Sequence, residues 1–330
     1  MRVWTIFKDG DAEWDDLVAQ LGGTSPFATA GWAQTKVLGR WTTARAVLAD
    51  DGEIVAAAQV FWMTIFRAFS IGWIPGGIAT KGAPDVAGFS TWFGGLAKTR
   101  FTYVRSAFHR AHCVADEELL IARGWSVSPS FVGARETFIV RKLTDRLADP
   151  SRLTPNWKRN LERGLKRNHD VSVCLTPDAS EINGLMREMV EFKKAKGPRD
   201  AMTEESLRHI CTAMHNRLIV VQVRDSQGQI QAVRGAFLVK DHAWDAIAAA
   251  GIDARKNYAS YVCAWKLMEE LDDRGVTSYD LAGIDEVRNE GVFNFKKGMG
   301  GARTTYLGEW DWASSPIALH LARVIISRLG

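Results

Sequence analysis

Cysteine is scarce in this sequence, and its placement excludes two classes of protein. The four cysteines lie far apart, with no Cys-x-x-Cys pair among them: Cys113, Cys174, Cys211 and Cys263. A small disulfide scaffold needs a denser set of cysteines, and a zinc site built on paired cysteines needs two that are close in sequence. We therefore expect four reduced thiols, which is typical of a cytoplasmic protein.

Long hydrophobic runs are also lacking. The most apolar stretch covers residues 54–66 and ends at Arg67, whereas a helix that spans a bilayer needs about 20 apolar residues. The apolar run at the start of the chain is likewise too short for a signal peptide. We therefore expect no membrane-spanning helix, a cytoplasmic location, and at most a peripheral contact with a membrane.

Several catalytic motifs are absent as well. The sequence has no Gly-x-x-x-x-Gly-Lys-[Ser/Thr], no Gly-x-Ser-x-Gly and no His-Glu-x-x-His, the signatures of P-loop nucleotidases, nucleophile-elbow hydrolases and zincins. His109, His112 and Cys113 are close in sequence but lack a second group of ligands, so a turn is the better interpretation. The glycines at 298, 300 and 301 open no predicted helix and form no dinucleotide fingerprint. We expect neither a metal nor a cofactor.

What is present is an ordinary globular composition, with 46% hydrophobic and 24% charged residues. At 330 residues the chain has the length of about two domains. The net charge of +4 is mild and allows an anionic partner without demanding one, so any strong basicity must be local.

An internal repeat supports two domains. The pattern Gly-x-Ile-x-Ala, followed by four residues and Phe, begins at Gly52 and again at Gly228. In both copies an apolar, β-branched run and a polar turn precede the pattern, which predicts a strand, a tight turn and a second strand. We therefore expect a duplicated domain.

The fold class follows from the order of the predicted elements. Helical spacing of apolar residues predicts helices at 181–194, 204–215 and 258–274, with strands around the hairpin and at 276–281. The first half predicts helices at 27–38 and 116–123, buried strands within 54–78 and a strand at 137–141. Interleaved helices and antiparallel hairpins indicate an α/β or α+β fold. The predicted domains are 1–150 and 151–313, with a terminal helix at 314–330 that packs back on the first.

The first group of candidate functional residues is basic. Residues 157–169 carry the five cations that we call the basic cluster: Lys158, Arg159, Arg163, Lys166 and Arg167. Arg159, Arg163 and Lys166 have the spacing of one helical face. Such a face is either a solvated surface or a surface for the phosphates of a nucleic acid or a diphosphate-linked substrate.

The second group follows a predicted strand that holds Tyr279 and Asp280. The segment 291–301 after it contains Phe295, Lys296, Lys297 and several glycines, and we interpret it as a glycine-rich loop. In such a loop the backbone can approach a ligand closely, and a lysine can meet a phosphate or a developing oxyanion. The alternative is a β-hairpin with incidental lysines.

Together with a third phrase, Phe27-x4-Trp32-x3-Lys36, these groups resemble the FemABX-like family of aminoacyl-tRNA-dependent transferases that form peptidoglycan bridges. The basic segment is similar to the family's Trp-x-x-Asn-x-x-Arg pattern, and residues 196–200 are similar to its turn that carries an arginine, here Arg199. The segments 258–265, 279–284 and 295–301 are similar to its C-terminal signature. The Tyr-Asp-Leu-x-Gly-Ile and Phe-Lys-x-Gly patterns in this order are the most specific part.

The resemblance implies a fold, an activity and partners. The fold is two tandem GNAT-like domains, in a compact form because no sustained heptad predicts a coiled-coil arm. The activity is transfer of an aminoacyl group from tRNA to an amine of a UDP- or lipid-linked peptidoglycan precursor. By position, Lys36 and Arg199 would bind the diphosphate of that precursor, and the basic cluster would bind tRNA. The other substrate-binding residues would be Trp32, Tyr258 and Tyr261.

The resemblance also places catalytic residues. Lys296, with Phe295 packed beside it, would lie near the aminoacyl end of the tRNA and the reacting carbonyl. The ester is already activated, so positioning and oxyanion stabilisation could supply most of the acceleration. A charged lysine cannot accept the proton of the attacking amine, so we expect an electrostatic role for it. Asp280 and Asp285 are the nearest carboxylates in sequence, and the sequence does not choose between them.

The identity of the acceptor amine stays open, and so do two alternatives to an aminoacyltransferase. Residues 74–77 read Ile-Pro-Gly-Gly where the family usually has Pro-Arg-Gly-Pro, so the acceptor could be another amine. An acyl-CoA N-acyltransferase would have the same fold, but the helix at 258 opens without the Gly-x-Gly turn that cradles a pyrophosphate. A non-catalytic relative that binds RNA or the cell envelope is the third interpretation.

Overall fold

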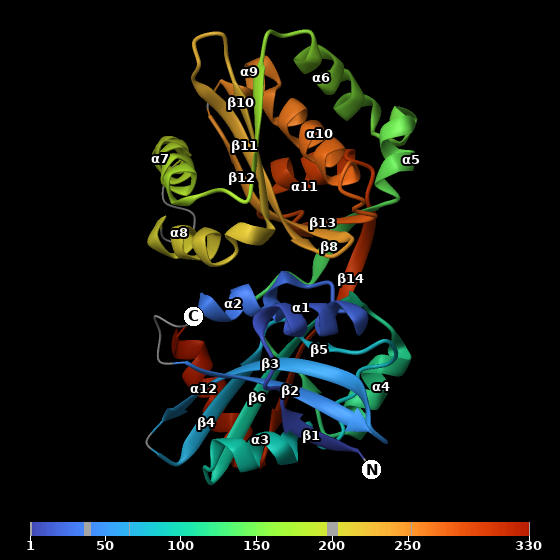
Figure 1. Ribbon diagram of the computed structural model, residues 1–330, viewed down its shortest axis with the longest axis vertical. Coiled ribbons are helices and arrows are strands. Elements are labelled where there is room, and N and C mark those ends of the chain that lie inside the picture. The colour runs from blue at the N-terminus through green and yellow to red at the C-terminus, as the bar shows by residue number, and fades with distance from the viewer. Residues whose placement is uncertain (1, 36–40, 66, 197–203, 252, 330) are drawn as a thin grey trace. The chain divides into compact units, whose positions relative to one another are not determined.

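The computed structural model describes the chain except for residues 1, 36–40, 66, 197–203, 252 and 330 (Figure 1). The chain divides into two compact units, each described here by itself. Unit 1 comprises Met1–Arg135 and Thr305–Gly330, and unit 2 comprises Glu136–Thr304. The sequence predicted the divisions near residues 150 and 313.

Unit 1 is a twisted sheet with helices on both faces (Figure 1). Its helices are α1 (Asp11–Gln20), α2 (Ala30–Gln34), α3 (Phe89–Ala97), α4 (Val114–Ala122) and α12 (Pro316–Leu329). Its strands are β1 (Val3–Ile6), β2 (Thr42–Asp50), β3 (Glu53–Ile65), β4 (Phe69–Ile74), β5 (Ile78–Ala79), β6 (Phe101–Ala111), β7 (Ser126–Val127) and β14 (Ala302–Ala313). The main strand order is β1-β2-β3-β4-β6-β14, and β4 runs parallel to β6 while the other neighbours are antiparallel.

Unit 2 has its sheet between a layer with α7 and α8 and a layer with α5, α6 and α10 (Figure 1). Its helices are α5 (Leu143–Ala148), α6 (Pro155–Leu165), α7 (Ala179–Lys196), α8 (Glu204–Ala213), α9 (Ala254–Asn257), α10 (Ala259–Asp272) and α11 (Glu290–Gly298). Its strands are β8 (Glu136–Arg141), β9 (Asp170–Leu175), β10 (Leu218–Arg224), β11 (Ile230–Val239), β12 (His242–Ala250) and β13 (Ser278–Gly283). The strand order is β9-β10-β11-β12-β13-β8, and only β12 and β13 pair in parallel.

The two sheets have the same sequence of pairing directions. The repeated Gly-x-Ile-x-Ala patterns lie in the hairpins β2–β3 and β10–β11, which hold the second and third places in their sheets. Both turn glycines adopt positive φ, +92° at Gly52 and +78° at Gly228, a region that residues with a Cβ avoid. The repeat in the sequence is therefore a repeat of strand topology.

The last strand of each sheet pairs with a strand that is far from it along the sequence. Strand β8 follows the elements of unit 1 along the sequence but pairs with β13, and β14 follows the elements of unit 2 but pairs with β6. The sequence predicted a strand at 137–141 without indicating its partner. Because pairing in a sheet is a long-range contact, periodicity along the sequence does not predict these two pairings.

Each unit also buries a tyrosine, an arginine and an aspartate together. In unit 1 the Tyr103 hydroxyl donates to Asp311 Oδ1 at 2.7 Å, and Arg105 Nε donates to the same oxygen at 3.0 Å. The backbone N–H groups of Val132 and Gly133 donate to the neighbouring Glu309 at 2.8 Å. Burial raises the pKa of Glu309. A buried carboxylate must be paired or hydrogen-bonded, and these contacts meet that need.

Two local predictions change. The helix predicted at 27–38 is a short 3-10 turn, Pro26–Ala28, followed by α2. Residues 36–40 lie outside the described residues. The segment predicted as a glycine-rich loop forms helix α11. No helix in the described part of the chain has the length and hydropathy that crossing a membrane requires.

Candidate active site

The site is assembled in unit 2 on the strands β11, β12 and β13. Arg234 Nη2 lies 2.8 Å from Asp245 Oδ2, and the Tyr279 hydroxyl donates to Asp245 Oδ1 at 2.7 Å. Arg234 Nε donates to the Tyr279 hydroxyl at 3.2 Å. The side chains of Arg234 and Asp245 are only 7% and 5% exposed. We call these three residues the buried triad.

The buried triad has fixed protonation states. Burial and the charge of Asp245 raise the pKa of Tyr279 well above its ordinary value, so its hydroxyl keeps its proton. Burial alone would lower the pKa of Arg234, but Asp245 outweighs that effect and the guanidinium stays charged. Burial raises the pKa of the neighbouring Cys263 thiol to about 12. The triad is therefore a static ion pair with a tyrosine donor, rather than a proton relay at neutral pH.

Helix α11 brings Lys296 to this group. The helix begins where Asn289 Oδ1 accepts from Val292 N at 3.4 Å. Phe293 and Lys296, three residues apart, face inward, whereas Lys297 is exposed. Lysine 296 is 8% exposed, and its Nζ donates to Gly283 O at 2.8 Å. The interpretation of this segment as a glycine-rich loop is therefore wrong, and Lys296 lies on the buried face of a helix.

The electrostatic surroundings of Lys296 come from the buried triad and from Asp280. Burial lowers the pKa of Lys296, Asp245 raises it, Arg234 lowers it and Asp280 raises it, in decreasing order of effect. The lysine thus lies in the field of two carboxylates and one guanidinium. An ammonium has three N–H donors, and among the described residues Lys296 Nζ donates to one acceptor, Gly283 O.

Asp280 and Asp285 have different surroundings. The carboxylate of Asp280 accepts from Thr137 Oγ1 at 2.6 Å and from Ala282 N at 2.8 Å. Residue Ala282 has φ +58°, so this contact holds a strained turn at the end of β13. The exposed Asp285 accepts from the backbone N–H groups of residues 287 and 288. Of these two carboxylates, Asp280 is thus the one whose charge acts on Lys296, and we assign it to the candidate site.

Aromatic rings surround Lys296's neighbour, Phe295. Its ring centroid lies 5.1 Å from that of Tyr261 and 5.8 Å from that of Trp157, and those two rings lie 5.2 Å apart. The Arg234 guanidinium carbon is 5.4 Å from the Phe295 ring centroid. Phe295 therefore connects the buried arginine to an aromatic cluster, a geometry that allows a cation–π contact.

The basic cluster lies on and just after helix α6. Trp157, Leu161 and Gly164 face inward, while all five cations of the cluster are exposed. A Cβ on Gly164 would lie 2.7 Å from Val262 Cγ2, so glycine lets α6 approach α10 closely. Arg163 Nη1 donates to the Tyr258 hydroxyl at 3.2 Å. The structure thus brings the predicted Tyr258 to the basic cluster.

The candidates of unit 1 form a separate group. The half-buried Trp32 packs edge-on against Phe27 at 4.7 Å, and Phe27 lies 5.3 Å from the ring of His109. Burial lowers the pKa of His109 to about 4. Two predicted diphosphate ligands, Lys36 and Arg199, lie outside the described residues, so their roles stay predictions.

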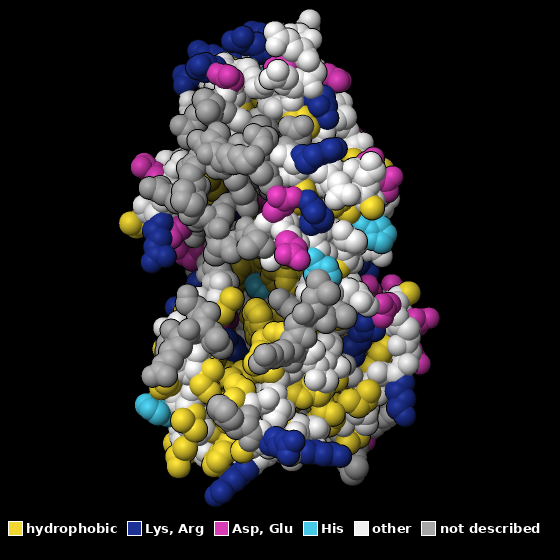
Figure 2. Space-filling view, turned by 90° about the vertical axis from the view of Figure 1, so that its left-hand side faces the viewer, with side chains coloured by type: hydrophobic (Ala, Val, Ile, Leu, Met, Phe, Trp, Pro, Cys, Tyr) yellow, Lys and Arg dark blue, Asp and Glu magenta, His cyan; other side chains and the backbone are white. Residues whose placement is uncertain are grey.

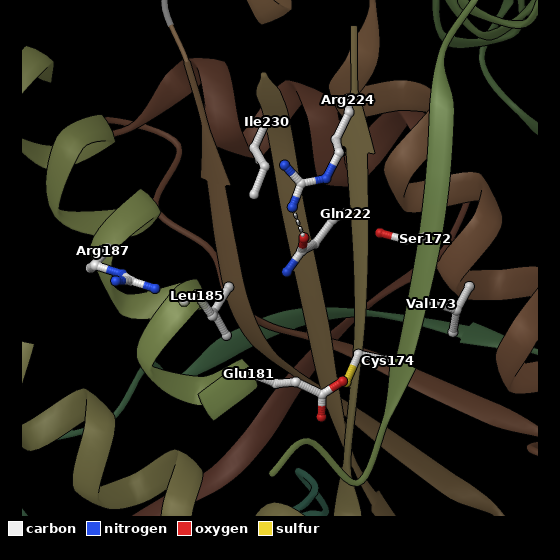
Figure 3. Close-up of a pocket in the computed structure, with 10 residues that line it drawn as sticks. Ser172, Val173, Cys174, Glu181, Leu185, Arg187, Gln222, Arg224 and Ile230 are labelled. Atoms are coloured by element: carbon white, nitrogen blue, oxygen red, sulfur yellow. Dashed lines mark hydrogen bonds between the residues drawn. The ribbon is translucent and has the colours of Figure 1, made fainter. Parts of the chain in front are cut away.

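A cavity of about 480 Å³ lies elsewhere in unit 2, between α7 and the strands β9, β10 and β11 (Figure 3). Arg224 Nη2 donates to Gln222 Oε1 at 3.0 Å, and both side chains, which come from β10, line the cavity. Burial raises the pKa of Cys174 to about 12, and a hydrogen bond with Glu181 acts in the same direction. None of the predicted site residues lines this cavity. Among the described residues, no group of three or more His, Cys, Asp or Glu is placed to hold a metal ion.

Sequence reasoning missed Arg234 and Asp245. A signal was present, because each is a single charge inside an apolar strand, in Ala-Val-Arg-Gly-Ala-Phe and in Ala-Trp-Asp-Ala-Ile. Charged side chains are almost never fully buried without a partner, so an isolated charge in such a strand predicts an opposite one nearby. The two strands of the pair, β11 and β12, are antiparallel neighbours.

Comparisons with known proteins support the FemABX-like resemblance over part of the chain and the fold over nearly all of it. The FemAB family model matches residues 179–326. A search of curated proteins finds no match for the chain. The crystal structure of FemX is similar with a TM-score of 0.83 at 15% identity, covering 97% of this chain and 100% of that one.

Two further solved structures have lower similarity. One is a tandem GNAT protein from the clavulanic acid biosynthesis pathway, with a TM-score of 0.55, 12% identity and coverage of 96% and 99%. The other is L-PGS from Bacillus licheniformis, with a TM-score of 0.56, 12% identity and coverage of 98% of both chains. At such identities the likeness shows the fold alone. The predicted α/β fold of tandem GNAT-like domains is confirmed, and so is the FemABX-like resemblance.

Proposed function

Because this chain is FemABX-like in its family pattern and its fold, we propose that it is an aminoacyltransferase. The donor is an aminoacyl-tRNA, and the acceptor is an amine of a UDP- or lipid-linked peptidoglycan precursor. The acyltransferase class rests on the FemAB pattern and the GNAT-like fold. The donor and the acceptor are the finer part of the proposal, and they rest on the signature residues.

The reaction is attack of an uncharged amine nitrogen on the ester carbonyl of the aminoacyl-tRNA. A C–N bond forms through a tetrahedral oxyanion, the C–O bond to the terminal ribose breaks, and the ribose hydroxyl takes up a proton as the amine loses one. The ester is already activated, so the protein has to orient the two substrates and stabilise the oxyanion. The chemistry requires no metal and no cofactor.

The buried ammonium of Lys296 is the observation that supports this proposal most. Within the described part of the chain it donates one hydrogen bond, to Gly283 O, and an ammonium has three donors, so donors are left for a further oxygen. Its positive charge lies close to that of Arg234, so an anionic oxygen placed beside Lys296 would be attracted by both cations. A donor aimed in advance at a developing oxyanion is worth about 10²–10³ in rate. Asp280, which raises the pKa of Lys296, helps to keep the ammonium charged.

The substrates would be bound by the remaining candidates. The basic cluster on and after α6 would bind the tRNA backbone. The hydrogen bond from Arg163 to Tyr258 would join this tRNA-binding surface to the start of helix α10. Lys36 and Arg199 would bind the diphosphate of the precursor, with Trp32 and Tyr261 as further contacts. A donor of aminoacyl-tRNA would place the reaction in the cytoplasm.

Acyl-CoA is the alternative donor. The structure opens helix α10 at Tyr258, whose φ is +61° and which makes no side-chain cap. A pyrophosphate needs several backbone N–H groups at an open helix N-terminus, usually after a Gly-x-Gly turn. A bulky aromatic residue at this point favours aminoacyl-tRNA over CoA.

The mass of the precursor after the reaction tests the proposed donor and acceptor. The protein is incubated with a mixed aminoacyl-tRNA pool and a UDP-linked precursor, and the precursor is weighed by mass spectrometry. We expect a mass gain of one aminoacyl residue, abolished when the tRNA is deacylated beforehand. A gain of one acetyl group with acetyl-CoA instead would establish the alternative donor. Binding of tRNA without any mass gain on any acceptor would favour the non-catalytic relative.

A further inference from the structure

Helix α12 of unit 1 carries an apolar stripe on its outer face. Ile317, Leu321 and Val324 are 64%, 42% and 36% exposed, and their spacing of four and three residues puts them on one side of the helix. The opposite side is core, because Ala318 and Ala322 are fully buried against β4 and β6. Since the inner face already holds the helix in place, the outer stripe is not needed for its packing.

Two turns of unit 1 bring cations to the same part of the sheet. The turn between β3 and β4 carries Arg67, and the turn between α3 and β6 carries Lys98 and Arg100, all exposed. The turns are adjacent, since Phe101 N donates to Ala68 O at 3.0 Å. Helix α12 starts beside them, because the backbone N–H of residue 314 donates to the carbonyl of residue 102 at 2.9 Å.

No carboxylate side chain accompanies these cations in their own segments. Residues 63–71, 89–101 and 313–330 contain five Lys and Arg residues and no Asp or Glu, although the chain has 38 acidic residues. Figure 2 views the side of unit 1 on which Figure 1 shows α12. Hydrophobic side chains gather there, with Lys and Arg below them. The surface thus combines exposed apolar side chains with positive charge of one sign.

We propose that unit 1 docks on an anionic lipid surface through the outer stripe of α12 and the cations Arg67, Lys98 and Arg100. The helix would lie in the plane of the interface, with its stripe among the acyl chains and the cations against lipid phosphates. This role does not depend on which acyl group the protein transfers.

Charge complementarity favours a bilayer over a second copy of the chain. A symmetric contact between two copies would bring the same three cations face to face, with no carboxylate in these segments to pair with them. Like charges that meet across an interface cost affinity. An anionic bilayer instead offers a negative charge for every cation.

Vesicle sedimentation tests the proposal with the full chain. The wild-type protein should bind vesicles that contain phosphatidylglycerol, and this binding should weaken as the salt concentration rises. It should bind vesicles of pure phosphatidylcholine weakly or not at all. Each cation near an anionic surface contributes a factor of about five, so Arg67→Gln, Lys98→Gln and Arg100→Gln together should weaken binding about 100-fold. Leu321→Glu should weaken it at least about tenfold, because it puts a charge into the stripe.

The matched control is Val287→Glu, which adds the same charge at a residue of unit 2 that is 92% exposed. It should leave vesicle binding unchanged, and thermal unfolding should show that all variants are folded. Absence of wild-type binding to phosphatidylglycerol vesicles, or equal binding by the triple variant, overturns the proposal. Concentration-dependent dimerisation that Leu321→Glu abolishes, without vesicle binding, would instead identify a self-association surface.

Discussion

The buried ion pair of Arg234 with Asp245 allows a quantitative prediction. In Asp245→Asn the guanidinium keeps its charge but loses its counter-ion, inside a group whose side chains are 7% and 5% exposed. Breaking a buried pair from one side costs about 3–5 kcal/mol, because the remaining charge stays desolvated. For a unit of this size, each kcal/mol lowers the melting temperature by about 2–4 °C. We therefore expect a fall of roughly 6–20 °C by calorimetry or circular dichroism.

The control is an exposed ion pair with nearly the same distance between nitrogen and oxygen. Lys256 Nζ lies 2.9 Å from Asp253 Oδ1, against 2.8 Å in the buried pair, but these side chains are 81% and 66% exposed. Asp253→Asn should cost less than about 1 kcal/mol, because water solvates both charges. Equal losses from the two aspartate variants would refute the argument that burial, rather than distance, sets the cost.

The paired replacement Arg234→Met with Asp245→Leu sharpens the test. Removing both charges leaves no isolated ion, so the double variant should be more stable than either single variant. If the two single losses simply added up in the double variant, Arg234 and Asp245 would not be coupled. The reasoning about the buried triad would then fail.

Three further predictions follow from the other groups. Charge reversal of Arg159, Arg163 and Lys166 in the basic cluster should weaken binding of all tRNAs alike and reduce its salt dependence, measured by filter binding; unchanged affinity would leave a solvated face. Lys36→Ala or Arg199→Ala should raise the acceptor KM while tRNA affinity stays constant, and an unchanged KM would remove that residue from the diphosphate site. His109, with its pKa lowered to about 4, binds no proton in the folded state between about pH 4 and 6.5 while the unfolded chain does. Stability should therefore fall by about 3 kcal/mol on acidification through this window, and His109→Phe should remove that part of the pH dependence.

The sequence predicted the parts of the fold that depend on local patterns. The hairpins at Gly52 and Gly228 follow from a turn with positive φ between two apolar runs, and both features are visible within a dozen residues. Helix α10 was predicted from its apolar spacing in the same way. The pairing of β8 with β13 and of β14 with β6 could not be predicted, because each joins two strands that are distant along the chain.

The candidate site was only partly predictable. Lys296 and Phe295 were identified by resemblance, but the glycines around them suggested a loop and hid the helical spacing of Phe293 and Lys296. That Lys297 matters less than Lys296 for turnover stays a prediction. Its physical basis in the structure is that Lys297 lies on the exposed side of helix α11, whereas Lys296 lies on the buried side. The Lys297 ammonium is 5.8 Å from the centre of the Phe293 ring.

The buried position of Lys296 also changes what its removal should do. A lysine on a glycine-rich loop could be replaced with little loss of folding, but Lys296 is 8% exposed and donates to Gly283 O. A loss of stability therefore has to be separated from a loss of catalysis. Both lysine variants must be assayed well below their own melting temperatures, with the folded fraction measured in the same sample.

The most direct test of the central claim is the turnover number of Lys296→Met beside that of Lys297→Met, with saturating aminoacyl-tRNA and precursor. Loss of one donor to an oxyanion costs about 10²–10³ in rate, so kcat of the folded Lys296→Met protein should fall by that factor. Lys297→Met should retain a kcat close to wild type, because its side chain faces solvent. Wild-type turnover in folded Lys296→Met would contradict the account, and equal losses in both variants would point to a diffuse phosphate patch instead.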